Sequence, residues 1–267
     1  MSWIITGKEA GSLGLLDQYG GAAAAYSLRS LTLYYTGPVV RVRRSNDDAE
    51  QDFTATEVSD GTLAAWVGAG DDGFVRTWYD QSGNSSDVGA VSQGDQPRIV
   101  ENGALVIENG NPAFSYNNSL LVGNCPLANT SNYAIAAVYR INTQKDPNPR
   151  YFAINDAGNG LNLQLGHNLD SKYFNRVDGV STVSASTYST LGSTNLLWWS
   201  ASAGVPAFSR NGQLDTFSNT GSPGANSEIG DGLFIFKGFT EAGYYSETGK
   251  IQELIIYSFD QSTNRAA

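Results

Sequence analysis

Short β-type stretches separated by tight turns are the feature of this sequence that most limits its fold. Asn-Gly pairs stand at 102–103, 109–110 and 211–212. Both positions of such a pair adopt positive φ at little cost, which suits the two-residue turns of antiparallel hairpins. Stretches rich in β-branched and aromatic residues recur roughly every dozen residues, a spacing typical of β-sandwiches. The pattern predicts an all-β, antiparallel protein.

The expected strands differ in how deeply they are buried. Residues 131–141 (SNYAIAAVYRI) are almost continuously apolar, which predicts a central strand buried on both faces. The strand at 39–43 alternates, so Val40 and Val42 are expected to face the core and Arg41 and Arg43 to face outward. Further strands are expected at 74–80, 98–100, 150–154, 161–165, 173–177, 195–201, 206–210, 233–239 and 250–257.

Two short helices are expected beside the strands. The Ala-rich run 22–31 has the propensity for a helix that caps one end of the sandwich, and residues 63–67 predict a helical turn between glycines. No composition shift divides the 267 residues, 40% of which are hydrophobic, so one domain is expected over 20–267. Residues 1–19 are expected to form an N-terminal arm, in which the apolar triplet Trp3, Ile4 and Ile5 would dock onto a neighbour.

Charge and cysteine content exclude several classes of function. Sixteen basic against 26 acidic residues give a net charge of −10, which argues against nucleic-acid binding because phosphate contacts need clustered Lys and Arg. Cys125 is the only cysteine, so neither a disulfide nor a thiolate zinc site is expected. The start lacks the pattern of a secretory signal and no stretch suits a membrane span, so we expect synthesis in a cytoplasm and no membrane partner.

One long block carries a resemblance to known proteins. The segments 22–53, 73–84 and 96–100 resemble the opening of the catalytic domain of fungal α-L-arabinofuranosidases, and more closely that of uncharacterised bacterial and tailed-phage proteins. The residues that carry it are Tyr26, Ser27, Arg29, Tyr35, Thr36, Gly37, Pro38, Arg41, Arg43, Arg44, Ser45, Tyr79, Asp80, Gln81, Ser82 and Gly83.

Two later segments are similar to laminin-G-like jelly rolls. These are AFSRNGQL around the 211–212 turn and GKIQELIIYSFDQS (249–262), which is similar to the closing strand of that fold. Together the matches run from about residue 20 to residue 262. The resemblance implies a two-sheet antiparallel jelly-roll sandwich of the concanavalin A-like kind.

The same resemblance implies where hydrolytic carboxylates would stand. A retaining glycosidase needs two carboxyl groups about 5 Å apart. The acid of the arabinofuranosidases would fall at 224–227, where Ala225 replaces the expected Asp. Their nucleophilic Glu would fall between residues 150 and 177, an interval without Glu, in which Asp156 and Asp170 stand in apparent turns. We therefore expect no enzyme, and a divergent glycosidase stays a third alternative.

Several other residues could have either a functional or a structural role. Asp80 could bind a metal or act in catalysis, but its setting in YDQSGN favours a turn held by side-chain to backbone hydrogen bonds. His167 is the only histidine and is expected in a turn, and Cys125 is expected to be a small core residue. The acidic pairs 47–48 and 71–72 could hold structural calcium, although neither has the spacing of a known loop, so no cofactor is expected.

Aromatic residues are the remaining candidates for ligand contact, because sugars stack on exposed rings. Trp198 and Trp199 are adjacent on an expected strand, so one faces the core and the other faces away. Trp199 and Tyr244 are the candidate glycan-binding residues, with packing in the core as the alternative for each.

These observations favour a non-catalytic virion protein of a tailed phage. It would decorate the capsid or form a head or tail appendage, present in symmetric copies or as a homo-oligomer in contact with other virion proteins. A glycan-binding module that recognises a host polysaccharide is the alternative.

Overall fold

The computed structural model gives the course of most of the chain. It describes residues 13–127, 132–144, 150–156, 160–167, 173–177, 180–184, 191–215, 217–219, 232–236, 238–240, 243–245 and 247–261. The expected docking triplet, Trp3, Ile4 and Ile5, lies outside the described residues.

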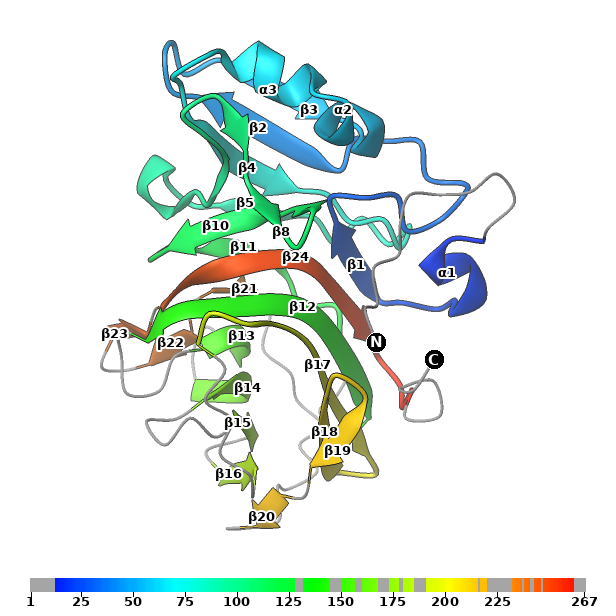
Figure 1. Ribbon diagram of the computed structural model, residues 1–267. Helices are drawn as coiled ribbons and strands as arrows, with labels where there is room; N and C mark the ends of the chain where they lie inside the picture. The colour runs from blue at the N-terminus through cyan, green and yellow to red at the C-terminus, as the bar shows by residue number, and fades with distance from the viewer. Residues whose placement is uncertain are drawn as a thin grey trace.

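Two curved antiparallel layers form the body of the protein (Figure 1). In the first layer, strands β1 and β10 lie end to end along one edge of β24, which is followed by β12, β17, β18 and β19. The bounds of these strands are β1 (Ala24–Ser27), β10 (Phe114–Asn117), β24 (Glu247–Tyr257), β12 (Tyr133–Gln144), β17 (Thr194–Ser202), β18 (Val205–Arg210) and β19 (Gln213–Asp215).

The second layer runs in the order β5, β11, β21, β13, β14, β15, β16 and β20. Its strands are β5 (Val88–Ala90), β11 (Leu121–Asn124), β21 (Gly232–Ile235), β13 (Arg150–Asp156), β14 (Gly160–His167), β15 (Tyr173–Val177), β16 (Val180–Ser184) and β20 (Phe217–Asn219). The two layers confirm the antiparallel β-sandwich that the turn pattern predicts.

A smaller lobe joins the two layers through one strand. The start of β4 (Gly73–Trp78) pairs with β6, and β6 in turn pairs with β10 of the first layer. The end of β4 pairs with β5 of the second layer. The lobe contains β2 (Val40–Arg44), β3 (Glu50–Phe53), β6 (Arg98–Glu101), β7 (Ala104–Leu105), α2 (Ala55–Ser59), α3 (Thr62–Val67) and the 3₁₀ turn η1 (Gln93–Asp95).

Short peripheral elements complete the chain. They are α1 (Leu15–Gln18), the hairpin of β8 (Ile107–Glu108) and β9 (Asn111–Pro112), and the hairpin of β22 (Gly238–Thr240) and β23 (Gly243–Tyr245). None of the helices in the described part of the chain is long and apolar enough to cross a membrane.

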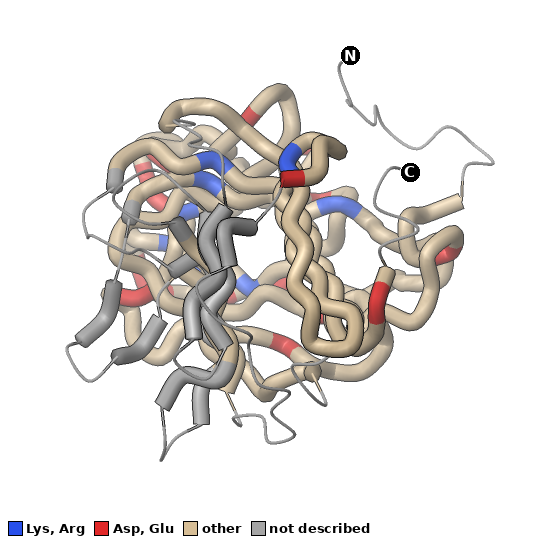
Figure 2. The backbone as a smooth tube through the Cα atoms, turned by 90° about the horizontal axis from the view of Figure 1, so that it is seen from below, with Lys and Arg blue, Asp and Glu red and all other residues tan. Residues whose placement is uncertain are grey.

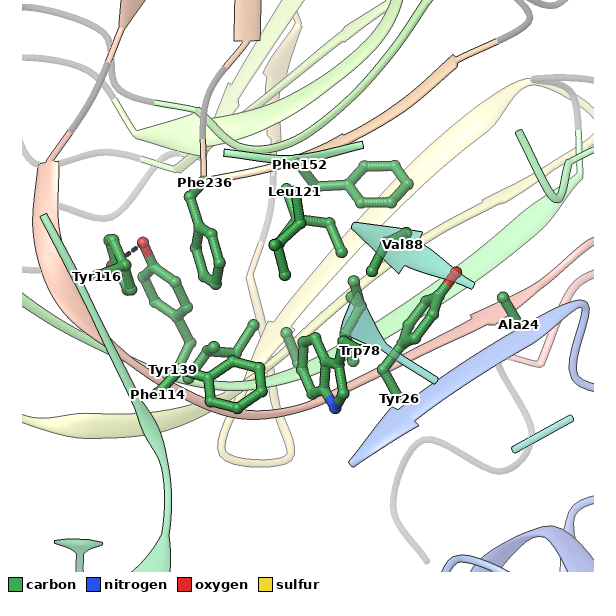
Figure 3. Packing of buried hydrophobic residues seen from close by; sticks show 14 of the residues in the cluster. Ala24, Tyr26, Trp78, Val88, Phe114, Tyr116, Leu121, Tyr139, Phe152 and Phe236 are labelled. Carbon is green, nitrogen blue, oxygen red and sulfur yellow. Dashed lines mark hydrogen bonds between the residues drawn. The ribbon is translucent and has the colours of Figure 1, made fainter. Parts of the chain in front are cut away.

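Large aromatic side chains fill the space between the layers (Figure 3). Trp78 lies between the rings of Tyr26 and Phe114, at centroid distances of 5.4 and 4.8 Å. Tyr116 stacks on Phe236 at 4.5 Å and its hydroxyl donates to that of Tyr139. Each of these rings is at most 2% exposed, so aromatic burial supplies much of the hydrophobic stabilisation of the sandwich.

The Asn-Gly pairs form the turns that the sequence predicts. In each pair both residues have positive φ: 51° and 78° at 102–103, 48° and 80° at 109–110, and 51° and 80° at 211–212. These values are those of type I′ turns, whose twist matches the flanking strands. The turns connect β6 to β7, β8 to β9 and β18 to β19.

Three expectations about local structure are wrong. The run 22–31 is not a helix: residues 24–27 form β1, because pairing with β24 outweighs the helical propensity of alanine. Arg43 does not face outward and is 8% exposed. The expected strand at 233–239 is divided between β21 and β22. By contrast, β12 is the expected central strand, with β24 on one side and β17 on the other.

Candidate functional site

Asp80 lies at the centre of the most specific part of the block that resembles arabinofuranosidases. Its side chain accepts hydrogen bonds from the backbone amides of Ala25 (2.8 Å), Ser82 (2.9 Å) and Ser86 (3.1 Å), and from the Ser82 hydroxyl (2.7 Å). Each carboxylate oxygen receives two of these bonds, and the residue is 5% exposed. The arrangement favours the structural interpretation of Asp80, since both oxygens are engaged by the protein itself.

Gln81 covers the backbone edge of β1 that does not pair with β24. Its amide N–H donates to Ala25 O at 2.8 Å, and its side-chain Nε2 donates to Ser27 O (2.9 Å) and Arg29 O (3.0 Å). Its Oε1 accepts from the amide of Leu31 at 2.9 Å. One buried glutamine thus satisfies backbone groups that an edge strand would otherwise expose to a second chain.

Arg29 ties the same block to the closing strand. Its guanidinium makes a two-point contact with Glu253 of β24, Nε to Oε2 at 2.9 Å and Nη2 to Oε1 at 3.1 Å. The Ser27 hydroxyl also donates to Glu253 Oε2, at 3.0 Å. Because the planar guanidinium matches a carboxylate in two places, this contact fixes the register of residues 27–29 on β24.

The three arginines of β2 are also engaged within the lobe. Arg43 donates to Gln96 at 2.8 Å, contacts Asp48 at 2.5 Å and lies 4.8 Å from the centroid of the Phe74 ring. Arg44 pairs with Asp47 and lies over Trp66, and Arg41 pairs with Asp52 at 2.8 Å. The lobe therefore uses its basic residues for ion pairs and cation–π contacts.

Tyr79, which opens the YDQSGN segment, extends the Arg41 contact. Its hydroxyl donates to Asp52 Oδ1 at 2.8 Å. Burial, with a further contribution from the Asp52 carboxylate, raises the pKa of Tyr79 to about 12. The phenol therefore stays protonated at neutral pH and serves as a donor.

Figure 2 shows basic and acidic residues interspersed over the described part of the chain.

A buried carboxylate on the β8–β9 hairpin makes ionic contacts with several strands on the outer face of the first layer. The Glu108 side chain, 5% exposed, accepts from Arg140 of β12 at 2.9 and 3.0 Å and from the Thr194 hydroxyl of β17, and lies 3.3 Å from Lys250 Nζ of β24. Burial opposes ionisation, yet these donors hold the pKa of Glu108 below its usual value.

The chemistry available to Glu108 follows from these contacts. A carboxylate with a lowered pKa is ionised at neutral pH, so it has no proton to give to a leaving group. Gln252 of β24 adds hydrogen bonds to the carbonyls of Glu108 (2.9 Å) and Asn111 (3.2 Å). Glu108 therefore anchors the hairpin to three strands.

Of the two candidate glycan-binding aromatic residues, the structure describes the side chain of Trp199 but not that of Tyr244. Trp199 is 1% exposed and packs against Phe208 at a centroid distance of 5.4 Å, so it cannot offer a ring face to a sugar, and this expectation is corrected. Its neighbour Trp198 points to the opposite side of β17, where it packs against a second apolar cluster that includes Ala134 and Ile255. Tyr244 is in β23, and its side chain lies outside the described residues.

The expected positions of hydrolytic carboxylates are only partly described. Residues 224–227 and Asp170 lie outside the described residues, and Asp156 ends β13. His167 is the last residue of β14, not part of the expected turn. The Cys125 thiol packs against the core and donates to Leu127 O at 3.6 Å, in keeping with its expected structural role.

The acidic pairs proposed for calcium have polar partners of their own. Asp71 accepts from the Ser45 hydroxyl and the Asn46 side chain, and Asp72 accepts from the amide of Asn102 at 2.9 Å. No group of three or more His, Cys, Asp or Glu side chains with metal-binding geometry occurs among the residues that the structure describes.

Sequence reasoning missed the roles of Glu108 and Glu253. Glu108 directly precedes the 109–110 turn, which placed it on a hairpin but gave no sign of what the hairpin covers. Glu253 is an acidic residue inside the apolar stretch 251–257, and a charge in such a stretch is a signal for a buried partner.

Comparison with known proteins identifies similar folds. No family model matches this sequence, and no curated protein matches it either. Among solved structures, an arabinofuranosidase complexed with arabinofuranosyl-α-1,2-xylobiose is similar with a TM-score of 0.62 at 15% identity, over 95% of this chain and 64% of that one. A GH54 α-L-arabinofuranosidase soaked with a cyclic sulfate inhibitor gives 0.64 at 14% identity, over 95% and 63%.

A more distant likeness is to a sialidase. The Trypanosoma rangeli sialidase gives a TM-score of 0.51 at 10% identity, over 72% of this chain and 30% of that one. At such low identities these likenesses establish the β-sandwich fold and nothing finer. The chain spans less than two thirds of the length of the arabinofuranosidases that it resembles.

Proposed function

We propose that this chain is a non-catalytic structural protein of a tailed-phage virion, displayed as a rigid β-sandwich knob on the capsid or on a head or tail appendage. Symmetric copies would contact other virion proteins through the N-terminal segment that contains Trp3, Ile4 and Ile5. The sequence resemblance to tailed-phage proteins favours this setting.

The observation that carries the proposal is how the chain uses its most specific block. The side chains of Asp80 and Gln81 form hydrogen bonds with backbone groups of β1 and of the residues that follow it. Arg29 forms an ion pair with Glu253. These contacts stabilise the junction between the closing strand and the lobe. A block whose polar atoms are used in this way suits a scaffold, with or without a catalytic site.

The sequence adds support against inherited hydrolase chemistry. The interval 150–177, which supplies strands β13, β14 and β15, contains no Glu, and position 225 is Ala where the resemblance requires Asp. Without a nucleophile and a proton donor about 5 Å apart, retaining hydrolysis has no route.

The direct test is whether the protein is part of the particle. Virions purified on a density gradient from a lysate that carries the gene are analysed by quantitative mass spectrometry and by immunogold labelling with antibodies to the purified chain. We expect a fixed copy number per particle and gold at one location. Protein found only in the soluble fraction of the lysate would refute the virion role.

The docking arm has its own test. Residues 13–19 contact the sandwich through α1, so the informative deletion removes residues 2–12 alone. We expect this deletion, and the triple change Trp3→Ala, Ile4→Ala and Ile5→Ala, to abolish incorporation while the sandwich stays folded by circular dichroism. Leu214→Ser, at an exposed position of β19, is the matched control and should incorporate normally. Normal incorporation of the deletion would refute docking through the arm.

A glycan-binding module is the second candidate, because the similar folds include an arabinofuranosidase with a bound oligosaccharide and a sialidase. With Trp199 in the core, Tyr244 is the remaining candidate for stacking on a host polysaccharide. A glycan array should then give a signal that Tyr244→Ala removes. Release of 4-nitrophenol from 4-nitrophenyl α-L-arabinofuranoside would instead identify a divergent glycosidase.

A further inference from the structure

The three Asn-Gly turns of this chain share one backbone conformation but differ in their contacts. In each turn both residues have positive φ, as in a type I′ turn. Asparagine followed by glycine is prone to deamidation, because glycine has no side chain to keep its backbone nitrogen away from the asparagine carboxamide. The carboxamide must swing over that nitrogen to react, so any bond that holds either group has to open first. The three turns should therefore differ in reactivity through their contacts.

In the turn between β6 and β7 the attacking nitrogen is occupied. The amide of Gly103 donates to Asp71 O at 2.7 Å, and the amide of Asn102 donates to Asp72 Oδ1 at 2.9 Å. The turn is also closely packed, because a Cβ on Gly103 would lie 2.9 Å from Gly68 O. The lobe thus holds the nitrogen that the reaction needs.

In the turn between β18 and β19 the carboxamide is occupied instead. Asn211 Oδ1 accepts from the amide of Leu196 at 2.9 Å, and Asn211 Nδ2 donates to Asn195 Oδ1 at 3.0 Å. The Asn211 amide also donates to Leu196 O at 2.9 Å. The carboxamide cannot turn towards the next nitrogen unless these bonds break.

The turn between β8 and β9 has neither protection. Asn109 and Gly110 are both exposed, and within the described part of the chain neither the Asn109 side chain nor the Gly110 amide forms a hydrogen bond. A Cβ on Gly110 would meet nothing within 4 Å. Asn111 Nδ2 donates to the carbonyl of Asn109 at 3.3 Å, which leaves the Asn109 carboxamide free to rotate.

We infer that Asn109 is the site at which this protein deamidates. The Gly110 nitrogen forms a bond with Cγ of Asn109, and its proton leaves with the carboxamide nitrogen as ammonia. Water then opens the resulting succinimide ring at one carbonyl to give aspartate or at the other to give isoaspartate. Either product places a new carboxylate next to the buried Glu108. The reaction needs no partner and is independent of the proposed function.

The isoaspartate product should release the hairpin that Glu108 anchors. The turn pairs Glu108 with Asn111, and isoaspartate lengthens the main chain between them by a methylene group, which disrupts this register. Gln252 donates to the carbonyls of both residues, so its contacts are lost as well. Deamidation of Asn109 is therefore a slow and irreversible way to loosen β8 and β9 from the first layer.

Peptide mapping of the folded protein tests the site directly. Protein stored in mildly alkaline buffer is digested with trypsin and a glutamate-specific protease, which separates the three turns because Glu101, Glu108 and Arg210 each precede an asparagine. Mass spectrometry then measures conversion of each asparagine. We expect the turn between β8 and β9 to convert about tenfold faster than the other two, which corresponds to roughly 1.4 kcal/mol of protecting contacts.

The same protein in urea is the control. Without the folded contacts the three turns should react at similar rates, because each has glycine after asparagine. Similar rates at the three sites in the folded protein, or conversion of Asn109 in urea alone, would overturn the inference.

Amide hydrogen exchange tests the release of the hairpin. The isoaspartate form, separated by anion exchange, should exchange faster in residues 107–112 than the unchanged protein, whereas residues 213–215 of β19 should exchange at the same rate in both. Equal exchange of residues 107–112 in the two forms would show that deamidation leaves the hairpin in place and would refute its release.

Discussion

The carboxylate of Asp80 accepts the backbone amide of Ala25 at 2.8 Å, across 55 positions of sequence. This bond joins the lobe to the first strand of the sandwich. Asp80→Asn keeps the size of the side chain but replaces one acceptor oxygen by an amide donor, which then faces backbone N–H groups. We expect a loss of about 2–4 kcal/mol in the free energy of unfolding, measured by urea denaturation.

Asp52→Asn is the matched control for this change. Asp52 pairs with Arg41 at 2.8 Å, but both side chains are about 40% exposed, and exposed pairs contribute about 0–1 kcal/mol. Equal destabilisation by the two variants would show that Asp80 is not a structural anchor.

Gln81 should protect the edge of β1 from pairing with other chains. Gln81→Glu preserves the shape of the side chain but sets an oxygen against the carbonyls of Ser27 and Arg29, where the amide group now donates. We expect faster amide hydrogen exchange in residues 24–27 and a higher tendency to aggregate, measured by light scattering. Unchanged exchange in β1 would argue against edge protection by Gln81.

Glu108 should make stability depend on pH in the acidic range. The folded state lowers the pKa of Glu108, so it prefers the ionised form, and the stabilisation is present above the unfolded pKa of about 4.5. As the pH falls below that value and through the folded pKa, this stabilisation is lost. We expect the urea midpoint to fall more steeply from pH 5 to pH 3 in the unchanged protein than in Glu108→Gln.

At neutral pH the same substitution should cost about 3 kcal/mol, because it leaves Arg140 and Lys250 without their shared buried carboxylate. Glu101→Gln is the control, since Glu101 makes an exposed contact with Arg98. Parallel pH profiles for the unchanged protein and Glu108→Gln would contradict the anchoring role of Glu108.

The sequence predicts those parts of this fold that depend on local chemistry. Turn positions such as Asn102 follow from the low cost of positive φ, and β12 follows from a continuous apolar run. The strand at Ala24 could not be predicted from propensity, because its partner lies more than 220 residues away in β24. The burial of Arg43 likewise depends on Gln96 and Phe74, which only the folded chain brings together.

Trp198 and Trp199 show the same limit for the candidate site. Alternation along a strand predicts that the two rings point to opposite faces, but it does not say which face is the core. The structure resolves this: Trp199 packs on Phe208 in the core between the layers, and Trp198 packs against the second apolar cluster on the other face of β17.

Substitution of the two tryptophans should therefore affect stability to different extents. Trp199→Ala removes a fully buried ring and leaves a cavity, for which we expect a loss of about 3–5 kcal/mol in the free energy of unfolding. Trp198→Ala removes a partly exposed ring and should cost less, because water can occupy part of the space. The urea midpoints of the two variants give the comparison. If Trp199→Ala proved as stable as the unchanged protein, the ring could not be a core residue, and its role as a sugar-stacking platform would be open again.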